Sequence, residues 1–400
     1  MTIIQSPLFR FLVLYALIYA AFGVQSPFLP ALLQERGLHP DAIAVILASS
    51  TAIRVLAGPL VGHAADRLQR HPAVLRACIA AAALAGTGYA LMQGAPELLL
   101  VGLCQAAALA PVVPLSDALA TTSAHLSQSA PRGYRFDYSL VRGAGSAAFI
   151  SGILLSGWAV QKSSLIAIIW LSSMLLMLAC SAGFGLPAIP SERGAGNTAA
   201  IFDPGDLVLL LRIKAFRSLL LTAALVEGSH ALHDSFAVIR WQAAGLGPVT
   251  IGVLWSESVA AEVVVFLLLG QRLIGLLGPA GACALSAGAG VLRWVVMALT
   301  TSPIALALVE PLHGLTFALL HLACMQLIVR VTPFSLAGTA QSIYGTLCVG
   351  LATAAVTLAS GALYETLGGA AFLVMAALCA MALPVCRGLR LGEKAHVPNS

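Results

Sequence analysis

Long apolar stretches dominate this chain, and each is about as long as a membrane is thick. They lie near residues 9–32, 41–64, 73–93, 97–124, 138–160, 163–185, 215–241, 248–270, 277–300, 303–329, 336–361 and 366–387. Because about 20 consecutive apolar residues cross a bilayer as a helix, we predict an all-α membrane protein with twelve transmembrane helices. The composition agrees, since 59% of the residues are hydrophobic and 9% are charged, against roughly 45–50% and 25% in soluble domains.

The basic residues predict how these helices are oriented. With the N-terminus inside, fifteen Lys and Arg residues fall at cytoplasmic ends and loops, three fall outside, and three, Arg54, Arg142 and Arg293, fall within spans. Cytoplasmic loops of membrane proteins carry such an excess of Lys and Arg. We therefore expect an integral multi-pass protein of a bacterial inner (plasma) membrane, embedded in the lipid bilayer, with both termini in the cytoplasm.

One polar stretch divides the chain into two halves. Residues 187–214 are rich in Pro and Gly and lie between the sixth and seventh spans, a composition that is typical of a loop. We predict a six-helix N-terminal bundle at 1–186, a cytoplasmic linker loop at 187–214, a six-helix C-terminal bundle at 215–390 and a cytoplasmic tail at 391–400.

A faint internal repeat supports this division. At an offset of 208 residues, Gly37, Leu38, Pro40, Ile43, Val45 and Gly62 match Gly245, Leu246, Pro248, Ile251, Val253 and Gly270. Parallel repeats related by an axis along the membrane normal are found in transporters. The alternative is a chance match of short apolar words, which the agreement with the linker and the number of spans disfavours. We expect two pseudo-symmetric bundles.

A short motif follows the second span. Gly62 is followed by Asp66 and Arg67, and then by a second cation, Arg70. The motif resembles the gating signature of the major facilitator superfamily, which implies the major facilitator fold. Gly62 would let two helices approach closely, Asp66 would face a helix N-terminus, and the arginines would lie at anionic headgroups. The matching stretch of the second half, Gly270-Gln271-Arg272, lacks the acid.

Within that superfamily the chain is similar to the phenylpropionate permease family, whose arrangement is lactose-permease-like. The resembling stretches are Pro111–Ala120 (PVVPLSDALA), Trp241–Gly245 (WQAAG), Val291–Trp294 (VLRW), Leu312–Phe317 (LHGLTF) and His321–Ala323 (HLA). The resemblance implies a proton-driven importer of small organic acids, aromatic ones in the characterised case, with the substrate held between the halves. Departures from the family pattern, which leave the substrate open, are Glu227, His233, Asp234, Arg240 and Glu257.

Charged residues inside the predicted spans are the candidate functional residues. A charge at mid-bilayer costs at least about 2.5–3.5 kcal/mol, so each one needs a partner, a cavity or a function. Matching depths predict three ion pairs: Arg54 with Glu262, Asp117 with Arg142, and Arg293 with Glu310. Each pair could bind substrate or protons, or could only fix helix packing.

Three carboxylates are left without a cation. Glu227, Asp234 and Glu257 lie in spans seven and eight, and Glu227, His230 and Asp234 are spaced to share one helix face. An unpaired buried carboxyl group is usually protonated at neutral pH, because burial disfavours its charged form. These residues are therefore candidates for proton coupling. The alternative is that Asp234 only reaches the outer headgroup region.

Two histidines of span ten, His313 and His321, are candidate relay or substrate residues. They are eight residues apart, about 12 Å along a helix, which is too far to bind one metal ion. The alternative is that each is a hydrogen-bonded packing residue. We expect no metal site and no cofactor, with the proton gradient as the driver.

Enzymatic motifs are absent from the sequence. It contains no HExxH, GxSxG, phosphate loop or Cys/His cluster, so neither metal hydrolysis nor ATP-driven transport through this chain is indicated. We expect a secondary active transporter, not an enzyme, that carries a small organic acid, which could be aromatic, in proton symport by alternating access. It would act as a monomer without nucleic acid.

Other functions remain open at this stage. Within transport, the alternatives are a proton-coupled sugar or nucleoside importer and a drug or metabolite efflux antiporter. Outside transport, the alternative is a membrane sensor or scaffold, although such a protein would have little need for so many intramembrane charges.

Overall fold

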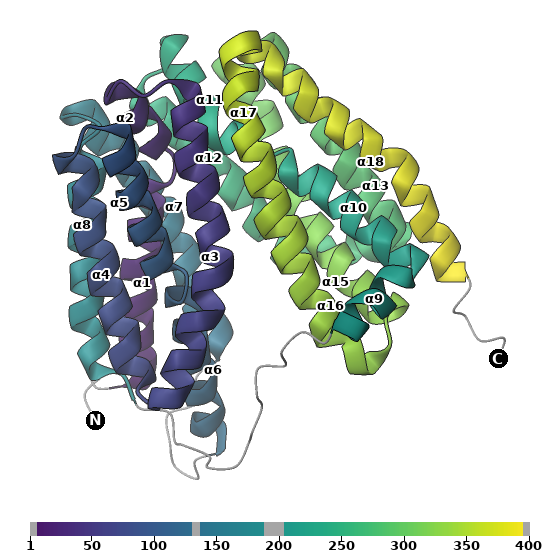
Figure 1. Ribbon diagram of the computed structural model, residues 1–400, viewed down its shortest axis with the longest axis horizontal. Helices are drawn as coiled ribbons and strands as arrows, with labels where there is room; N and C mark the ends of the chain where they lie inside the picture. The colour runs from purple at the N-terminus through teal and green to yellow at the C-terminus, as the bar shows by residue number, and fades with distance from the viewer. Residues whose placement is uncertain (1–5, 130–136, 188–203, 395–400) are drawn as a thin grey trace. The chain divides into compact units, whose positions relative to one another are not determined.

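The computed structural model describes residues 6–129, 137–187 and 204–394, which form helices joined by short turns without any strand (Figure 1). The helices up to residue 187 are α1 (Pro7–Gln25), α2 (Leu29–Glu35), α3 (Pro40–Leu68), α4 (His71–Leu91), α5 (Ala95–Leu109), α6 (Val112–Ser129), α7 (Tyr138–Lys162), α8 (Ala167–Ala182) and η2 (Gly183–Gly185). The all-α prediction is confirmed for the described residues.

The second part of the chain is helical too, but its helices are more often interrupted. They are α9 (Pro204–Arg212), α10 (Lys214–Gly228), α11 (Ala231–Ala243), α12 (Pro248–Val264), η3 (Val265–Leu269), α13 (Gly270–Leu299), α14 (Pro303–Val309), η4 (Glu310–Leu312), η5 (Gly314–Leu319), α15 (Leu320–Val331), η6 (Phe334–Leu336), α16 (Ala337–Ile343), η7 (Tyr344–Ala352), α17 (Thr353–Leu367), η8 (Gly368–Ala370) and α18 (Ala371–Lys394). Of these, η3, η5 and η7 are π-helical.

The number of helices fits twelve membrane crossings. Nine helical stretches of the described residues are long and apolar enough to cross a membrane. Two of them, Pro248–Leu299 and Phe334–Leu389, have 52 and 56 residues, enough for two crossings each at about 20 residues per crossing. Both change direction at a glycine with positive φ, Gly278 or Gly368. The remaining crossing is span seven, which consists of the two short helices α10 and α11.

The break in span seven departs from the single helix predicted at 215–241. The chain leaves the helix at Ser229 and His230, between α10 and α11. The Ser229 hydroxyl donates to the Val226 carbonyl at 2.6 Å and accepts from Trp294 Nε1 at 2.9 Å. Side-chain bonds of this kind compete with helical backbone bonds, and the preceding Gly228 lowers helix propensity. The hydroxyl bonds of Ser229 and the preceding glycine thus accompany the interruption at this point.

The chain separates into two compact units. Unit 1 comprises Met1–Leu38, Ser49–Asn197 and Gly247–Val253, and unit 2 comprises His39–Ala48, Thr198–Leu246 and Leu254–Ser400. The chain passes from unit 1 to unit 2 after Asn197, inside the predicted linker. The units differ from the predicted halves in that each includes a short segment from the start of a span predicted for the other half.

The predicted loop at 187–214 is partly helical. Residues 188–203 lie outside the described residues, as do 395–400 of the predicted tail. Residues Pro204–Arg212 form α9, with Asp206 in the first turn and Arg212 in the last. The acid near the N-terminus and the base near the C-terminus both interact favourably with the helix dipole, and Pro204 suits a first helical position. Part of the predicted linker is thus helical, and α18 continues through residues 391–394 of the predicted tail.

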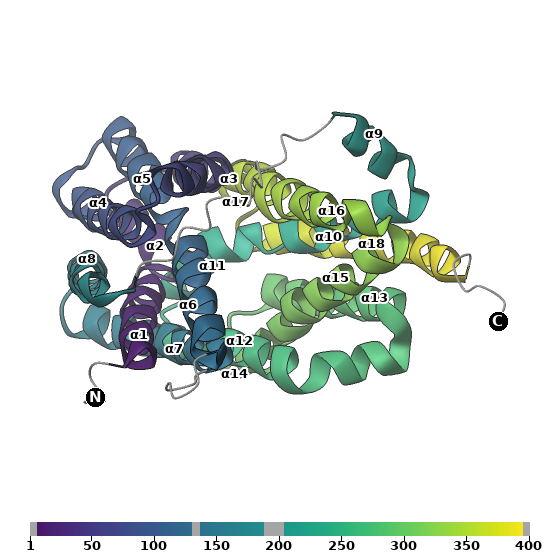
Figure 2. The ribbon, with the colours of Figure 1, turned by 90° about the horizontal axis from the view of Figure 1, so that it is seen from below.

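Unit 1 is built around α1, which lies beside α7 and α8 (Figures 1 and 2). The N-cap Ser6 accepts from the Phe9 amide, and Pro7 follows it, a favoured start for a helix. Close approach of α1 to α7 depends on glycine, since a Cβ at Gly23 would meet the Phe149 backbone and a Cβ at Gly152 the Ala20 backbone. Glycine at these positions allows the close helix contact.

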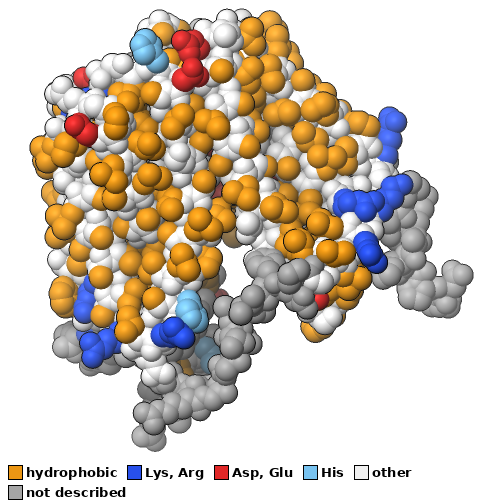
Figure 3. Space-filling model, viewed as in Figure 1, with side chains coloured by type: hydrophobic (Ala, Val, Ile, Leu, Met, Phe, Trp, Pro, Cys, Tyr) orange, Lys and Arg blue, Asp and Glu red, His pale blue; other side chains and the backbone are white. Residues whose placement is uncertain are grey.

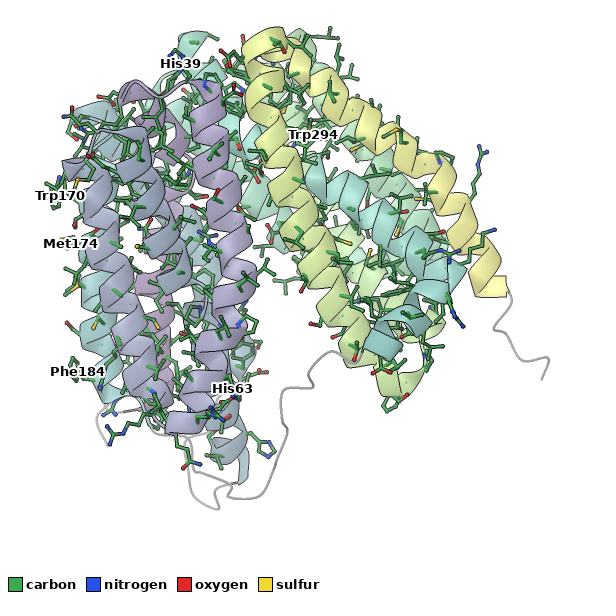
Figure 4. All side chains as sticks on the ribbon, viewed as in Figure 1. His39, His63, Trp170, Met174, Phe184 and Trp294 are labelled. Atoms are coloured by element: carbon green, nitrogen blue, oxygen red, sulfur yellow. The ribbon has the colours of Figure 1, made fainter. Side chains whose placement is uncertain are left out.

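Apolar side chains cover much of the outside of both units. Hydrophobic atoms dominate the face shown in Figure 3, with Lys and Arg near its edges. On α8 and η2, Trp170, Met174 and Phe184 point away from the helices of unit 1 (Figure 4), with exposed fractions of 51%, 52% and 72%. Exposed apolar surface on this scale marks contact with lipid. The multi-pass membrane prediction is confirmed.

Candidate functional site

The charged residues of unit 1 are bonded to tyrosines. Arg142 on α7 donates through Nη1 to the hydroxyl of Tyr19 on α1, and its guanidinium lies 4.9 Å from the centre of that ring. Asp117 on α6 accepts through Oδ1 from Tyr138 at 2.7 Å and from Tyr15. Arg142 is exposed, so the cation faces open space on one side and an aromatic ring on the other.

The predicted ion pair between Asp117 and Arg142 is wrong. In the described chain, no carboxylate lies within 4.0 Å of the Arg142 guanidinium, and Asp117 is bonded to two tyrosine hydroxyls. Tyrosine hydroxyls explain the difference, because they can donate to a carboxylate and accept from a guanidinium. The depth of a residue along its helix does not indicate these tyrosine contacts, so the sequence prediction missed them.

Aromatic rings surround these charges. Tyr15 and Tyr19 stack at 5.8 Å between ring centres, and Tyr19 meets Phe22 edge to face at 5.8 Å. Tyr138 meets Tyr15 at 6.5 Å in a T-shaped arrangement. Because Tyr15, Tyr19 and Phe22 are spaced three and four residues apart on α1, they line one face of this helix. Unit 1 therefore combines one exposed cation with a row of aromatic rings.

The predicted pair of Arg54 and Glu262 stays a prediction. Arg54 lies on α3 in unit 1, with its side chain exposed, and Glu262 lies on α12 in unit 2. Within unit 2, Glu262 Oε2 lies 3.7 Å from Nε2 of His313. Glu262 therefore has at least one partner of its own.

The centre of unit 2 holds the third predicted pair, which is confirmed. Arg293 Nη2 on α13 donates to Glu310 Oε2 at 2.8 Å, and both side chains are 0% exposed. Glu310 also accepts from Ser258 on α12. Burial of this pair removes it from water, so its attraction must offset the desolvation of both charges. The pair ties α12, α13 and η4 together.

Two histidines extend this ion pair into a chain of polar contacts. His313 Nδ1 lies 3.1 Å from Arg293 Nη1, and its Nε2 faces Glu262. On the other side, His233 Nε2 lies 3.3 Å from Glu310 Oε1 and 3.5 Å from Arg293 Nη2. Three tryptophans pack around this region, and one of them, Trp294, is fully buried and labelled in Figure 4.

The three residues predicted to share one face of span seven differ in exposure, and their shared face stays a prediction. Glu227 and His230 are each 5% exposed, whereas the Asp234 side chain is 56% exposed and bonded to His233 at 3.0 Å. His230 bonds Thr316 on η5 at 2.9 Å. Glu227 has a buried oxygen, Oε1, with no hydrogen-bond partner in the described part of the chain.

The other predicted site residues lie farther from this chain of contacts. His321 on α15 lies 3.3 Å from the Tyr344 hydroxyl, which fits either a relay or a packing role. Glu257 on α12 is partly buried. Within the described ranges, no group of three or more His, Cys, Asp or Glu side chains could hold a metal ion.

Sequence reasoning placed His233 only among departures from a family pattern, and its central position was missed. The signal was present, since His233 and Asp234 are adjacent polar residues in an otherwise apolar span. Alone, however, the sequence does not reveal that the imidazole turns inward while the carboxylate turns outward.

The signature after the second span lies at the end of α3. Oδ1 of Asp66 lies 2.8 Å from Nε2 of His71, the first residue of α4. Arg67 and Arg70 are exposed, as a role at headgroups requires. A Cβ at Gly62 would meet no atom within 4 Å, so the predicted close helix approach at Gly62 is wrong within unit 1.

Comparisons with known proteins agree with this architecture. The family described as the MFS_1 like family matches residues 8–375. The probable 3-phenylpropionic acid transporter of Escherichia coli (strain K12) is 30% identical over 362 residues, which cover 90% of this chain and 92% of that protein. The maltose permease of Geobacillus stearothermophilus is 27% identical over 88% of this chain and 86% of that protein.

Solved structures share the fold at low sequence identity. A mutant of the nucleoside transporter NupG superposes with a TM-score of 0.86 at 17% identity, over 96% of this chain and 100% of that one. The human organic anion transporter MFSD10 (TETRAN) has a TM-score of 0.64 at 17% identity, over 95% of this chain and 98% of that one. At these identities the likeness concerns the fold alone.

Proposed function

Because the chain belongs to the MFS_1 like family of the major facilitator superfamily, and is therefore a membrane transporter and not an enzyme, we propose that it imports a small organic acid together with protons. Transport would proceed by alternating access in a bacterial inner membrane, with both termini in the cytoplasm. The proton gradient would be the driver, without a cofactor. The observation that carries the proposal is the exposed Arg142 cation among the aromatic rings of unit 1.

Arg142 can bind the carboxylate of a substrate. In the described part of the chain its hydrogen-bond partner is the neutral Tyr19 hydroxyl, so its positive charge is not cancelled by an ion pair. A guanidinium presents several N–H donors in a planar fork that suits a carboxylate. Holding such a charge inside a membrane is costly, and an anionic substrate would offset that cost during transport.

The rings beside Arg142 favour an aromatic acid. Tyr19 and Phe22 meet edge to face, an arrangement that a further ring can extend with favourable stacking. A carboxylate on Arg142 would then lie beside the row of rings on α1. The name of the E. coli relative, a probable 3-phenylpropionic acid transporter, supports this substrate class. Sugars and nucleosides, named for other similar proteins, are the competing classes.

Unit 2 offers groups for proton coupling. Glu227 is buried with an unpartnered oxygen in the described structure, and Glu310 is held by Arg293 and Ser258. A carboxyl group in such an environment can gain or lose a proton when its partners move. We infer that unit 2 carries the proton while unit 1 recognises the anion.

Uptake into proteoliposomes tests the proposed function. Purified protein would be reconstituted, a pH gradient acidic outside would be imposed, and uptake of labelled 3-phenylpropionate, maltose and uridine would be compared. We expect uptake of the acid that collapses with a protonophore. Preferential uptake of maltose or uridine would replace the substrate class. Transport only as efflux against protons, or no flux of any probe, would contradict the proposal.

An arginine variant tests the substrate contact. Arg142→Gln should weaken acid uptake about 10- to 100-fold, because a charge-assisted hydrogen bond contributes about 1.5–3 kcal/mol. The matched control is Arg76→Gln, since Arg76 also packs its guanidinium over a ring, that of Phe184 at 4.1 Å, but at the end of unit 1 where α4 meets η2. The control should transport normally. Equal losses in both variants would contradict recognition by Arg142.

A further inference from the structure

His233 lies between two carboxylates in unit 2. Its Nδ1 is 3.0 Å from Asp234 Oδ1 and its Nε2 is 3.3 Å from Glu310 Oε1. The imidazole is 4% exposed, Glu310 is 0% exposed and the Asp234 side chain is 56% exposed. One ring nitrogen thus contacts an accessible carboxylate, and the other contacts a fully buried one.

The hydrogen-bonding capacity of imidazole limits the protonation states of this group. Neutral imidazole has one N–H donor and one acceptor nitrogen, whereas imidazolium has two donors. A ring between two ionised carboxylates therefore satisfies both only as imidazolium. If the ring is neutral, one of the two carboxyl groups must carry the proton. Either way the three side chains share one proton more than two carboxylates and a neutral ring would hold.

At the buried end of the group, Glu310 has an oxygen that can accept this proton. Oε2 of Glu310 is bonded to Arg293 and Ser258. Oε1 of Glu310 accepts no hydrogen bond in the described structure, although His233 Nε2 lies 3.3 Å away. A small rotation of either side chain would complete that contact. Oε1 is therefore the acceptor that the relay lacks in this conformation.

Other charged groups face His233 from the surrounding helices. From α13, Arg293 Nη2 is 3.5 Å from Nε2 and favours an ionised Glu310 and a neutral ring. His230 and His313 act on it electrostatically, and Glu257 on α12 acts on Glu310. The remaining walls are uncharged and are formed by Trp241, Trp255 and Trp294, with ring centres 5.8, 4.7 and 5.9 Å from that of His233.

We propose that Asp234, His233 and Glu310 form a proton relay between the accessible surface and the buried Arg293–Glu310 pair, a step that rests on the proposed proton coupling. The protonated carboxyl group of Asp234 gives its proton to Nδ1 of His233, which makes the ring an imidazolium between two carboxylates, and the proton on Nε2 then passes to Oε1 of Glu310. The ring changes tautomer, Asp234 becomes a carboxylate, Glu310 becomes a neutral acid, and the total charge is unchanged. Arg293 then loses its ionised partner.

The consequence is a link between protonation and the central contact of unit 2. A neutral Glu310 attracts Arg293 less strongly than an ionised one. Protonation would therefore weaken the contact that ties α12, α13 and η4 together. His233 acts here as a proton-relaying residue that does not contact substrate.

Tryptophan fluorescence tests the relay without any substrate. Protonated imidazole quenches a neighbouring indole more strongly than neutral imidazole, and three of the five tryptophans of the chain surround His233. Purified protein should lose fluorescence as the pH is lowered, and His233→Gln should abolish this titration. The control His230→Gln should keep it, because His230 contacts only Trp294 among these rings. A titration that survives in His233→Gln and disappears in His230→Gln would overturn the proposal.

Transport assays then test whether the relay moves protons. For 3-phenylpropionate in proteoliposomes, His233→Gln and Asp234→Asn should slow uptake driven by a pH gradient by about 100-fold, the lower range for a positioned proton-transfer group. Exchange of labelled for unlabelled substrate at equal pH requires no net proton movement and should continue. The exposed His39, labelled in Figure 4, supplies the control His39→Gln, which should leave both assays unchanged.

The outcomes separate the relay from the proposed function. Wild-type protein that shows no proton-driven uptake of the acid contradicts the proposed function, and the fluorescence titration still decides on the protonation of His233. Proton-driven uptake in the wild type that persists in His233→Gln overturns the relay alone. Loss of both uptake and exchange in a folded His233→Gln protein assigns the residue to substrate positioning and also overturns the relay.

Discussion

The two units treat charges inside the membrane in different ways. In unit 1, Arg142 and Asp117 are each bonded to tyrosine hydroxyls and stay unpaired with each other. In unit 2, Arg293 and Glu310 form a direct ion pair with no exposed surface. A neutral hydroxyl satisfies a charge without cancelling it, whereas an ion pair cancels it. Unit 1 is therefore suited to attract an ion, and unit 2 to respond to a proton.

The helices of the two units differ in a related way. All three π-helical segments of the described chain, η3, η5 and η7, lie in unit 2. Such segments are rare and often occur at functional sites. In η5, Thr316 bonds His230, and the segment follows directly on His313. In unit 1, by contrast, α1 and α7 are regular helices that meet through glycines.

The units nevertheless share one detail at the offset of 208 residues. Arg36 donates to the carbonyl of Ala90 near the end of α4 at 2.8 Å, and Arg240 donates to the carbonyl of Ala298 near the end of α13 at 3.0 Å. Ala90 and Ala298 are 208 residues apart. An arginine thus caps the equivalent helix end in each unit, although the arginines themselves are 204 positions apart.

The largest expected difference between the units concerns the loss of a carboxylate. Glu310→Ala should destabilise the protein by about 3–5 kcal/mol, because it leaves Arg293 buried and uncompensated. Asp117→Ala in unit 1 should cost less, about 1–3 kcal/mol, because it leaves only tyrosine hydroxyls without a partner. Thermal unfolding in detergent, followed by circular dichroism, measures both.

A double variant checks the cause of the Glu310 effect. Arg293→Met combined with Glu310→Leu removes both charges, and such replacements of buried pairs are often neutral or stabilising. The double variant should therefore unfold near the wild-type temperature, although proton-driven transport should be lost. A double variant less stable than Glu310→Ala would show that packing, and not charge, explains the single variant.

The sequence predicted the helical class and the Arg293–Glu310 pair, because each depends on local hydropathy or on depth along a helix. It failed for Asp117 and Arg142, although their depths match as well. Depth says nothing of the direction in which a side chain turns or of which neutral group is closer. Tyr19 on α1 contacts Arg142 because α1 packs beside α7. Tyr138 on α7 contacts Asp117 because α7 packs beside α6.

The sequence also failed at span seven. A continuous apolar pattern predicts one helix, whereas the chain forms α10 and α11. The bond between Ser229 and Trp294 joins residues 65 positions apart, so no local pattern contains it. The contacts of His233 with Glu310 and Arg293 are also distant in sequence, which is why the proposed relay could not be predicted from the sequence.

The second prediction concerns the close helix contact of unit 1. Gly152→Ala should destabilise the protein by about 1–3 kcal/mol, because its Cβ would meet the Ala20 backbone, which cannot move without shifting α1. Gly143 lies on the same helix with no atom within 4 Å of a Cβ. The control Gly143→Ala should stabilise by up to about 1 kcal/mol through helix propensity. Thermal unfolding should thus change in opposite directions, and equal shifts would contradict the close contact.

The smallest expected effects sharpen the similarity between the units. Arg240→Met should cost about 1–2 kcal/mol, because it removes hydrogen bonds to the Met297 and Ala298 carbonyls, each worth about 0.5–1.5 kcal/mol.

Arg36→Met should cost less, about 0.5–1.5 kcal/mol, since one carbonyl bond is lost. Methionine keeps the apolar stem of the side chain, so the difference reports mainly on the hydrogen bonds. Unfolding temperatures of the two variants, measured side by side in one detergent, provide the comparison. If Arg36→Met proves the more destabilising, the helix end of unit 1 depends on its arginine more than that of unit 2, and the two caps are not equivalent parts of a repeat.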